Sequence, residues 1–549
     1  MKRAMSYTDT QTRMTRWRVP CLPKGLSGGH MPLKNTNYRH MKFSQLIRKN
    51  ILVLAFLPSI VFGQQKQINI VDLGAKGDGV TDNTLIIQKA IDEASASGNG
   101  KVIVPAGTFL TGVIHVKSNV EINLAENAVW LGSAKRIDYG AKDASPLIVA
   151  KGQHDFSITG KGVIDGNGKE LIKDIYAMLN AGTLEDSEWQ TYNPWNQKRP
   201  EERNRPKIIL FQNCDSIRVK GITIKNGLMW VQDYRSCTNV TIDNIKVRST
   251  TFLNNDGIDI TDSKNVRITN CDIDCADDGI CLKSSLRNEG CENVYVANCR
   301  VRSSASALKL GTASWGGFRN ITIRDITVYD TYRSAIAIEA VDGGILEDVD
   351  VQNIKATNTG NAIFIRLGHR NADAVISQLR RVHIANVKVE IPLGKPDKGY
   401  PEEGPIVRYP HNVFPSSVSG FDGHPVEDVT LENVEVIYEG GGNTQVASLP
   451  IDSLSKIPEQ IAEYPEFSMF GELPAWAFYV RHVNSLKLKN ISVNAKNSDY
   501  RSAFVFDDVV GLEMGKIKIE ENDSNPQIIM KRVTERSIDI DNNMKKEIR

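Results

Sequence analysis

A short strand-like pattern recurs along most of the chain and constrains its fold more than any other feature. Asn or Asp is followed by alternating apolar and polar residues, as at 239–247, 265–271, 293–299 and 320–323. Equivalent apolar positions at 217, 240, 266, 294, 321 and 349 are 23, 26, 28, 27 and 28 residues apart. Alternation is typical of half-buried β-strands, and its regular return indicates successive coils of a solenoid.

The pattern predicts an all-β chain in which residues 64–549 form a single right-handed parallel β-helix. Asn and Cys recur at equivalent positions, as in Asn270-Cys271 and Asn298-Cys299. We expect these side chains to stack into ladders, with amides hydrogen-bonded along the solenoid axis. Longer gaps between repeats, at 156–217, 382–429 and 429–486, predict inserted loops, which often form the walls of a site.

The region before the repeats predicts a helix over residues 81–94. Its apolar residues have helical spacing, and Asp82 is the candidate N-terminal cap. A strand is expected to begin at Lys101. We expect the helix to cover the open first coil of the solenoid and so protect its unpaired strand edge. The apolar positions are Leu85, Ile86, Ala90, Ile91 and Ala94.

The segment that starts at Met41 has the organisation of a secretory signal peptide. A basic start is followed by an apolar run from Ile51 to Phe62 and then by Gly63. A membrane span would need roughly 20 apolar residues, so we expect export with cleavage near Gly63, with a buried helix as the alternative. Residues 1–40 are basic and unpatterned, and we interpret them as a mispredicted extension upstream of the true start.

Composition narrows the classes of partner. A chain with 41% hydrophobic and 24% charged residues is expected to fold. Without residues 1–63, which hold 11 Lys/Arg and 1 Asp/Glu, 56 basic and 64 acidic residues remain, a net charge of −8. Nucleic-acid binding then lacks its electrostatic basis, and an acidic substrate would need a local basic cleft. We expect a polysaccharide or oligosaccharide partner, no nucleic acid, and no membrane after signal removal.

Seven cysteines lie between Cys214 and Cys299. Their odd number at repeat positions favours buried, stacked thiols, although an exported protein is also permitted disulfides. Neither paired Cys-x-x-Cys sets nor histidine ligands accompany them, so no zinc site is predicted. We expect no cofactor and no metal.

Four aspartates form the candidate chemical centre. Asp256 and Asp259 lie in the run 254–259, and Asp277 and Asp278 begin 21 residues after Asp256. One coil advances about 4.8 Å, so these carboxylates should lie almost above one another. Hydrolysis with inversion needs an acid and a base roughly 6.5–9.5 Å apart, a distance that adjacent coils can span. An Asp ladder or a calcium site is the alternative.

At these residues the chain resembles the polygalacturonase and rhamnogalacturonase family, glycoside hydrolase family 28. The resemblance covers most of the chain after residue 63. Its first element is shared with other β-helix proteins, whereas the two Asp motifs at their separation are specific. The matching segments are 72–83, 205–211, 226–230, 254–259 and 277–284.

The resemblance implies hydrolysis by inversion, in which Asp277 is the general acid and Asp256 and Asp278 position and deprotonate the water. Asp259 is included as an additional catalytic candidate because it is similar to an extra carboxylate of rhamnogalacturonase-like members.

Two departures from the family pattern point to a different sugar. Ser306 stands where the polygalacturonases have the histidine of Gly-His-Gly. Ala337 and Glu339 stand where they have the two cations of Arg-Ile-Lys, and Glu339 should repel a galacturonate in that subsite. We therefore favour a rhamnogalacturonan-type or other uronate-containing glycan over homogalacturonan.

Nearby side chains are proposed as replacement contacts. Cations could meet acidic groups of the substrate, Trp230 could stack on a sugar ring, and His369 could assist as an acid or base. The proposed cations are Lys283, Lys309, Arg333 and Arg366.

The sequence thus favours a secreted or periplasmic glycoside hydrolase that cleaves an acidic, pectin-like polysaccharide. A polysaccharide lyase on the same scaffold is one alternative, but it would need a Lys or Arg base and a metal-held uronate. A carbohydrate-binding β-helix without activity is the other. The altered motifs favour it, and the intact set of aspartates opposes it.

Overall fold

A computed structural model describes residues 65–549 apart from 192–197, 405–410, 443, 445–448, 521–525 and 541–544. Residues Gln64–Arg549 form one compact unit. The proposed extension 1–40 and signal peptide 41–63 lie outside the described residues, so both stay predictions.

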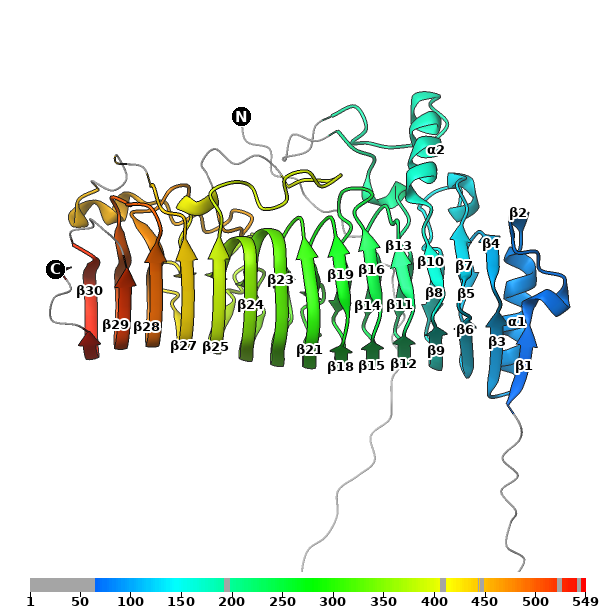
Figure 1. Cartoon of the computed structure of the whole chain (residues 1–549), viewed down its shortest axis with the longest axis horizontal. Helices are drawn as coiled ribbons and strands as arrows, with labels where there is room; N and C mark the ends of the chain where they lie inside the picture. Colours follow the sequence, from blue (N-terminus) through cyan, green and yellow to red (C-terminus); the bar gives the residue numbers. More distant parts are fainter. Residues whose placement is uncertain are drawn as a thin grey trace, which may run out of the picture. The chain divides into compact units, whose positions relative to one another are not determined.

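The unit is a right-handed parallel β-helix, which confirms the predicted fold. Its strands stack side by side along one long axis, and each pairs with the equivalent strand of the next coil (Figure 1). The strands of the first coils are β1 (Lys66–Asn69), β2 (Asp78–Asp82), β3 (Gly100–Val104), β4 (Gly107–Thr111), β5 (Ile114–His115), β6 (Val120–Leu124), β7 (Ala128–Gly132), β8 (Ile148–Lys151), β9 (His154–Gly160) and β10 (Val163–Asp165).

Three short strands make up each coil in the middle of the solenoid, so pairing runs from each strand to the third one after it. For example, β14 pairs with β17, and β17 pairs with β20, always in parallel. These strands are β11 (Ile209–Gln212), β12 (Asp215–Lys220), β13 (Thr223–Lys225), β14 (Gln232–Arg235), β15 (Thr238–Asp243), β16 (Lys246–Ser249), β17 (Ile258–Thr261), β18 (Lys264–Thr269), β19 (Asp272–Cys275) and β20 (Ile280–Ser284).

In the C-terminal half the strands lengthen and bend around corners of the coil. β23, for instance, pairs with both β21 and β22. The strands here are β21 (Cys291–Ser303), β22 (Leu308–Ser314), β23 (Gly317–Ala340), β24 (Ile345–Leu367), β25 (Gln378–Ile391), β26 (Ser416–Ser419), β27 (Val426–Tyr438), β28 (Ala475–Ala495), β29 (Ser502–Glu520), β30 (Ile528–Ile540) and β31 (Lys546–Ile548).

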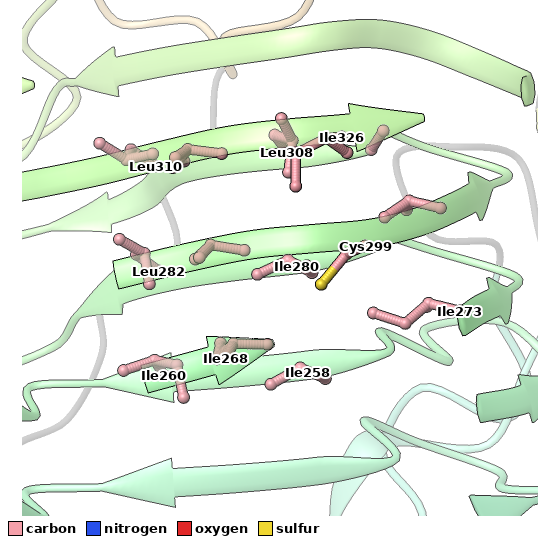
Figure 2. Packing of buried hydrophobic residues seen from close by; sticks show 14 of the residues in the cluster. Ile258, Ile260, Ile268, Ile273, Ile280, Leu282, Cys299, Leu308, Leu310 and Ile326 are labelled. Atoms are coloured by element: carbon pink, nitrogen blue, oxygen red, sulfur yellow. The ribbon is translucent and has the colours of Figure 1, made fainter. Parts of the chain in front are cut away.

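The core is a set of aliphatic columns that run along the axis. Ile258 of β17 lies beside Ile280 of β20 and then Leu308 of β22, and all three are at most 2% exposed. Figure 2 shows this column together with its neighbour, which contains Leu282 and Leu310. Because side chains alternate between the two faces of a strand, the residues between these columns point away from the core.

An asparagine ladder follows one corner of the solenoid, as predicted. Asn265 donates a side-chain hydrogen bond to Asn239 at 3.2 Å, Asn293 donates to Asn265 at 3.0 Å, and Asn320 donates to Asn293 at 2.7 Å. All four have φ between 53° and 57°. Asn adopts this left-handed conformation more readily than other residues with a Cβ, which explains its recurrence at the corner.

The seven cysteines from Cys214 to Cys299 are all buried free thiols. Cys271 and Cys299 occupy equivalent positions on consecutive coils, one residue before the paired Asp272 and Arg300. The prediction of stacked thiols is therefore confirmed for this pair.

Helix α1 (Thr84–Ala96) packs on the first strands of the solenoid, as expected of a capping helix (Figure 1). Its buried face consists of Ile87, Ala90, Ile91 and Ala94. The helix begins at Thr84 rather than at residue 81. Its N-cap residue is Asn83 rather than the expected Asp82, although the backbone N–H of Thr84 donates to the Asp82 carboxylate at 2.9 Å.

The long connections project from one edge of the solenoid (Figure 1). They are the segment from β10 to β11, which contains helix α2 (Gly168–Asn180), and the segments from β25 to β26 and from β27 to β28. A loop was expected before Ile217, and α2 was not predicted. The buried face of this helix consists of Leu171, Ile175 and Leu179. Among the described residues, no helix has both the length and the apolarity of a membrane span.

Candidate active site

The candidate site lies where two neighbouring coils turn into β17 and β20. Asp256 comes just before β17, and Asp277 and Asp278 come just before β20. The N–H of Gly257 donates to the Asp278 carbonyl at 2.8 Å. Since Ile258 pairs with Ile280, Asp278 lies one coil above Asp256, at an offset of 22 residues. The expected stacking is therefore present, but its partner is Asp278 rather than Asp277.

The three carboxyl groups converge more closely than expected. One oxygen from each of Asp256, Asp277 and Asp278 lies within 4.8 Å of the others. This distance between nearest oxygens is below the roughly 6.5–9.5 Å proposed from the sequence. The spacing between paired strands explains the difference, because it holds adjacent coils only about 4.8 Å apart.

Lys283 of β20 neutralises Asp256 and Asp259. Its Nζ lies 2.8 Å from Asp256 Oδ2 and also donates to Asp259 Oδ1. Both carboxylate side chains are almost completely buried, at 4% and 0% exposed. Asp256 and Asp259 raise the pKa of Lys283 well above its ordinary value although burial opposes this, so the ammonium stays protonated.

Lys309 of β22 neutralises Asp278. Its Nζ lies 3.2 Å from Asp278 Oδ2. The other carboxylate oxygen, Oδ1, accepts a hydrogen bond from the N–H of Ser306 at 3.1 Å. Burial would raise the pKa of Asp278, but the ammonium groups of Lys309 and Lys283 lower it below its ordinary value. Asp278 is thus held as a carboxylate.

Asp277 has no ammonium contact of this kind among the described residues. Its Oδ1 accepts from the N–H of Asp278 at 2.9 Å, and its Oδ2 accepts from the Asn254 amide at 3.4 Å. Burial, together with the charge of Asp278, raises the pKa of Asp277. Burial also raises the pKa of Asp256, against the effect of Lys283. Two neighbouring carboxyl groups, Asp277 and Asp278, therefore have pKa values shifted in opposite directions.

Asn254 is itself fixed by the buried Arg205. Arg205 donates through Nη2 to Asn254 Oδ1 at 3.0 Å and through Nη1 to the carbonyls of Leu228 and Leu253 at 2.9 and 3.0 Å. The guanidinium thus connects the backbone at Leu228 and Leu253 to Asn254, the residue that contacts Asp277.

A cleft of about 360 Å³ opens over the carboxylates. Besides the three aspartates, the coils of the solenoid contribute Trp230, Lys283, Lys309 and Arg333 to its lining. The long connections contribute further parts of the walls, with Arg199 and Glu202 from one, Glu403 and Gly404 from the second, and Tyr464 from the third. Trp230 is partly exposed, and its ring lies 4.4 Å from Lys283 Nζ.

Three proposed site residues lie outside this lining. Asp259, the additional catalytic candidate, is 0% exposed and accepts a hydrogen bond from Lys283, so it contacts the lysine rather than the cleft. Arg366 is 1% exposed and donates to the carbonyls of Gly420 at 2.9 Å and Glu459 at 2.6 Å. It anchors the connection from β27 to β28, so the structure gives no support for Arg366 as a substrate contact. The ring Nε2 of His369 lies 2.7 Å from the Asp373 carbonyl, so the structure gives no support for His369 as an acid or base.

The two departures from the family pattern also have a structural explanation. Ser306 supplies a backbone N–H to Asp278, a role that does not depend on its side chain. Glu339 is 1% exposed and does not line the cleft. The structure therefore gives no support for the expectation that Glu339 repels a galacturonate in that subsite. Glu339 accepts from Thr312 at 3.0 Å and lies 3.9 Å from Lys309. Burial raises the pKa of Glu339 to about 7.

Two sets of side chains have the donor atoms of a metal site. One oxygen or sulfur from each member of Asp256, Asp259 and Cys281 lies within 4.8 Å of the others, as in the set of three aspartates above. Lys283 Nζ lies 3.1 Å from Cys281 Sγ and within bonding distance of Asp256 and Asp259. Since the ammonium already supplies the positive charge, we assign no metal to these residues.

Three residues of the cleft were not predicted from the sequence, namely Arg199, Glu403 and Tyr464. All three lie in irregular connections without the repeat pattern, so no local signal marked them. Lys309, by contrast, occupies a regular strand position, where alternation predicts only that it points out of the core.

Comparisons with known proteins agree with this geometry. The family model for glycosyl hydrolases family 28 matches residues 95–401. The chain is similar to the exo-poly-alpha-D-galacturonosidase of Dickeya chrysanthemi, with 28% identity over 328 residues, 51% of this chain and 53% of that protein. It thus spans about half the length of that relative. Polygalacturonase-2 of Solanum lycopersicum is 22% identical over 387 residues, 68% of this chain and 76% of that protein.

Among solved structures, a hyperthermoactive exopolygalacturonase from Thermotoga maritima is similar, with a TM-score of 0.54 and 25% identity. The match covers 68% of this chain and 88% of that one.

Proposed function

The chain belongs to glycosyl hydrolases family 28, and we propose that it hydrolyses glycosidic bonds in a uronate-containing, pectin-like polysaccharide. The observation that supports this best is the group of three carboxyls in one cleft, two of which contact buried ammonium groups. General acid-base hydrolysis needs one protonated and one ionised carboxyl at the reacting bond, and carboxyls that differ in their ammonium contacts can supply both.

Asp277 is proposed as the general acid. Its pKa is raised, and its Oδ2 is the oxygen that the Asn254 amide contacts, while the backbone occupies Oδ1. It would protonate the leaving glycosidic oxygen. Asp278 is proposed as the base that takes a proton from the attacking water, because Lys309 and Lys283 keep it ionised. Asp256 would hold the same water from the coil below.

We propose inversion as the stereochemical course. The short distance between nearest oxygens is closer to that of retaining enzymes, in which a carboxylate attacks the sugar directly. However, both oxygens of Asp278 accept protein hydrogen bonds or ammonium contacts, and Asp256 is bound by Lys283. Such clamped carboxylates are better suited to orienting water. A proton NMR spectrum of the first product tests this, since retention would identify one of them as the nucleophile.

An acidic substrate is supported by four cations that line the cleft besides Lys309, which are Arg199, Lys283, Arg333 and Arg370. Lys283 and Arg333 are the proposed contacts from the regular coils, and Trp230 is the proposed aromatic surface. The names of the relatives agree with this class, since they are described as acting on galacturonans. A galacturonan or rhamnogalacturonan-type glycan is therefore the first substrate to test.

The two alternatives are less well supported. A lyase needs a base that removes a carbon-bound proton, usually beside a metal-held uronate, and here Lys283 and Lys309 are both engaged with carboxylates. A binding module without activity would not need carboxyl groups with opposed pKa shifts. We also propose that the protein is exported, to the periplasm or beyond, because of the segment 41–63; N-terminal sequencing of the exported protein should begin after Gly63.

The test combines a reducing-end assay with ultraviolet monitoring on homogalacturonan, rhamnogalacturonan and other uronate glycans. The wild type should produce reducing ends without the absorbance of a new double bond, and Asp277→Asn should lower the rate by about 10²–10⁴-fold. Asp350→Asn, an exposed carboxylate on the outer surface, is the matched control and should remain active. Ultraviolet gain would support a lyase, and binding without cleavage would support the inactive module.

A further inference from the structure

Lys309 has an environment that a substrate-binding lysine would not need. Its side chain is 1% exposed, although the cleft lies beside it. Its Nζ lies 3.2 Å from Asp278 Oδ2, 3.1 Å from the Tyr464 hydroxyl and 3.9 Å from Glu339 Oε2. An ammonium group has three N–H donors, and three protein oxygens already surround this one.

These three oxygens come from three separate parts of the chain. Asp278 precedes β20, Glu339 is at the end of β23, and Tyr464 belongs to the connection between β27 and β28. Lys309 itself is on β22, where it pairs with Cys281 below and Ala337 above. The ammonium therefore joins the base to a loop that lies far away in the sequence.

We propose that Lys309 is a positioning residue for Asp278, held in place by Glu339 and the Tyr464 hydroxyl, rather than a ligand of the substrate. The proposal rests on the function proposed above, in which Asp278 is the base. It assigns to Tyr464 a role in completing the active site, because its hydroxyl accepts the Lys309 hydrogen bond and its ring lines the cleft.

The charges around this pair determine what its removal would do. Asp278 is influenced by cations of β20, β22 and β23 and lies close to two other carboxyls, and Lys309 lies close to a further carboxyl, a phenol and a guanidinium. Around Asp278 these groups are Lys283, Lys309, Arg333, Asp256 and Asp277, and the thiol of Cys281 on β20 also faces it. Around Lys309 they are Glu339, Tyr464 and Arg333. Without Lys309, the ammonium in contact with Asp278 is lost, and the proton affinity of Asp278 should increase.

The experiment measures kcat/KM against pH for the wild type, Lys309→Met, Lys309→Arg and Tyr464→Phe. Its acidic limb reports the ionisation of the essential base in the free enzyme. Lys309→Met should shift this limb to higher pH by at least one unit. At pH values on the acidic side of the limb, kcat/KM should then fall at least tenfold. Lys309→Arg should keep the limb near its wild-type position but lower kcat, and Tyr464→Phe should move it by less than Lys309→Met.

A control and a second readout separate this inference from a simple folding defect. Lys388→Met removes an exposed lysine that pairs with Glu435 and should leave the profile unchanged. Denaturant unfolding of Lys309→Met, Asp278→Asn and the double variant should reveal coupling at pH 7. This coupling should disappear as the pH falls through the lowered pKa of Asp278, since protonation removes the charge that Lys309 stabilises.

The outcomes are distinguishable. A raised KM with an unmoved acidic limb in Lys309→Met would identify a substrate ligand and overturn the inference, as would an absence of coupling at pH 7. If Asp278→Asn is inactive and the limb still does not move, the inference fails while the proposed function stands. If the wild type cleaves no glycan but the coupling is present, the proposed function fails instead.

Discussion

The Lys283 ammonium lies 2.8 Å from the Asp256 carboxylate, and both side chains are at least nine-tenths buried. A buried ion pair of this kind contributes little to stability by itself, but removing one partner leaves an uncompensated charge. The same ammonium also binds Asp259, so two carboxylates on one coil depend on a lysine of the next.

Replacing Lys283 should therefore destabilise the fold in a pH-dependent way. Lys283→Met is expected to lower the free energy of unfolding by about 3–5 kcal/mol at pH 8. The loss should be smaller at pH 5, because Asp256 and Asp259 can then take up protons. Urea unfolding at the two pH values measures this. The double variant Lys283→Met/Asp259→Asn should recover part of the stability, and equal losses at both pH values would contradict the explanation.

Arg205 is predicted to affect catalysis without contacting the cleft. Arg205→Lys cannot reproduce the hydrogen bonds to Asn254, Leu228 and Leu253, because an ammonium is a point donor and a guanidinium is a planar fork. We expect kcat to fall about tenfold with little change in KM, since Asn254 would no longer be fixed beside Asp277.

Steady-state kinetics on the best substrate measure kcat and KM separately and so check this expectation. Arg203→Lys, at a half-exposed site that pairs with Glu201, is the matched control. An unchanged kcat in Arg205→Lys would mean that other contacts, such as the hydrogen bond from Arg199, suffice to hold Asn254.

Glu339 should make the stability fall as the pH rises. Burial raises its pKa from 4.5 to about 7, so the folded protein binds this proton more tightly than the unfolded chain does. The stabilisation is complete below about pH 4.5 and is lost as the pH rises through 7. Glu339→Gln should remove this slope, which is on the order of 3 kcal/mol. Urea unfolding between pH 4 and 8 measures it, and parallel curves for the variant and the wild type would refute it.

The asparagine ladder should tolerate glycine better than alanine. Asn265 has φ 56° and both donates to Asn239 and accepts from Asn293. Asn265→Gly loses these hydrogen bonds, at a cost of about 1–2 kcal/mol. Asn265→Ala loses them as well and adds about 1–2 kcal/mol for a Cβ in the left-handed region. Thermal unfolding of the two variants measures the difference, and a more stable alanine variant would show that the corner relaxes.

Much of the architecture was accessible from the sequence because its signals are local and repeated. The alternation around Ile258 and Ile280 reports which side chains face the core, and the return of Asn at 239, 265, 293 and 320 reports the corners. The aspartates before β17 and β20 were found in the same way, and the family was recognised from their spacing. The capping helix was predicted too, with its start displaced to Thr84.

Contacts that depend on connections of irregular path could not be predicted from the sequence. Arg366 and Lys309 both have outward strand positions, yet Arg366 anchors a loop and Lys309 is enclosed by Asp278 and Tyr464. Alternation reports the face of a strand, but it does not report what covers that face. The Tyr464 loop has no repeat to reveal where it crosses the solenoid.

The sequence by itself determined the β-helix, the corner asparagines and the three carboxyls, since each follows from alternation or from motif spacing along the chain. Only the tertiary structure decided that Asp278 rather than Asp277 stacks on Asp256, and that Lys283 neutralises Asp256 and Asp259 while Lys309 neutralises Asp278. Those relationships depend on the number of residues in one coil and on loops that meet from distant segments, and proximity in space, not in sequence, sets the charge of each aspartate.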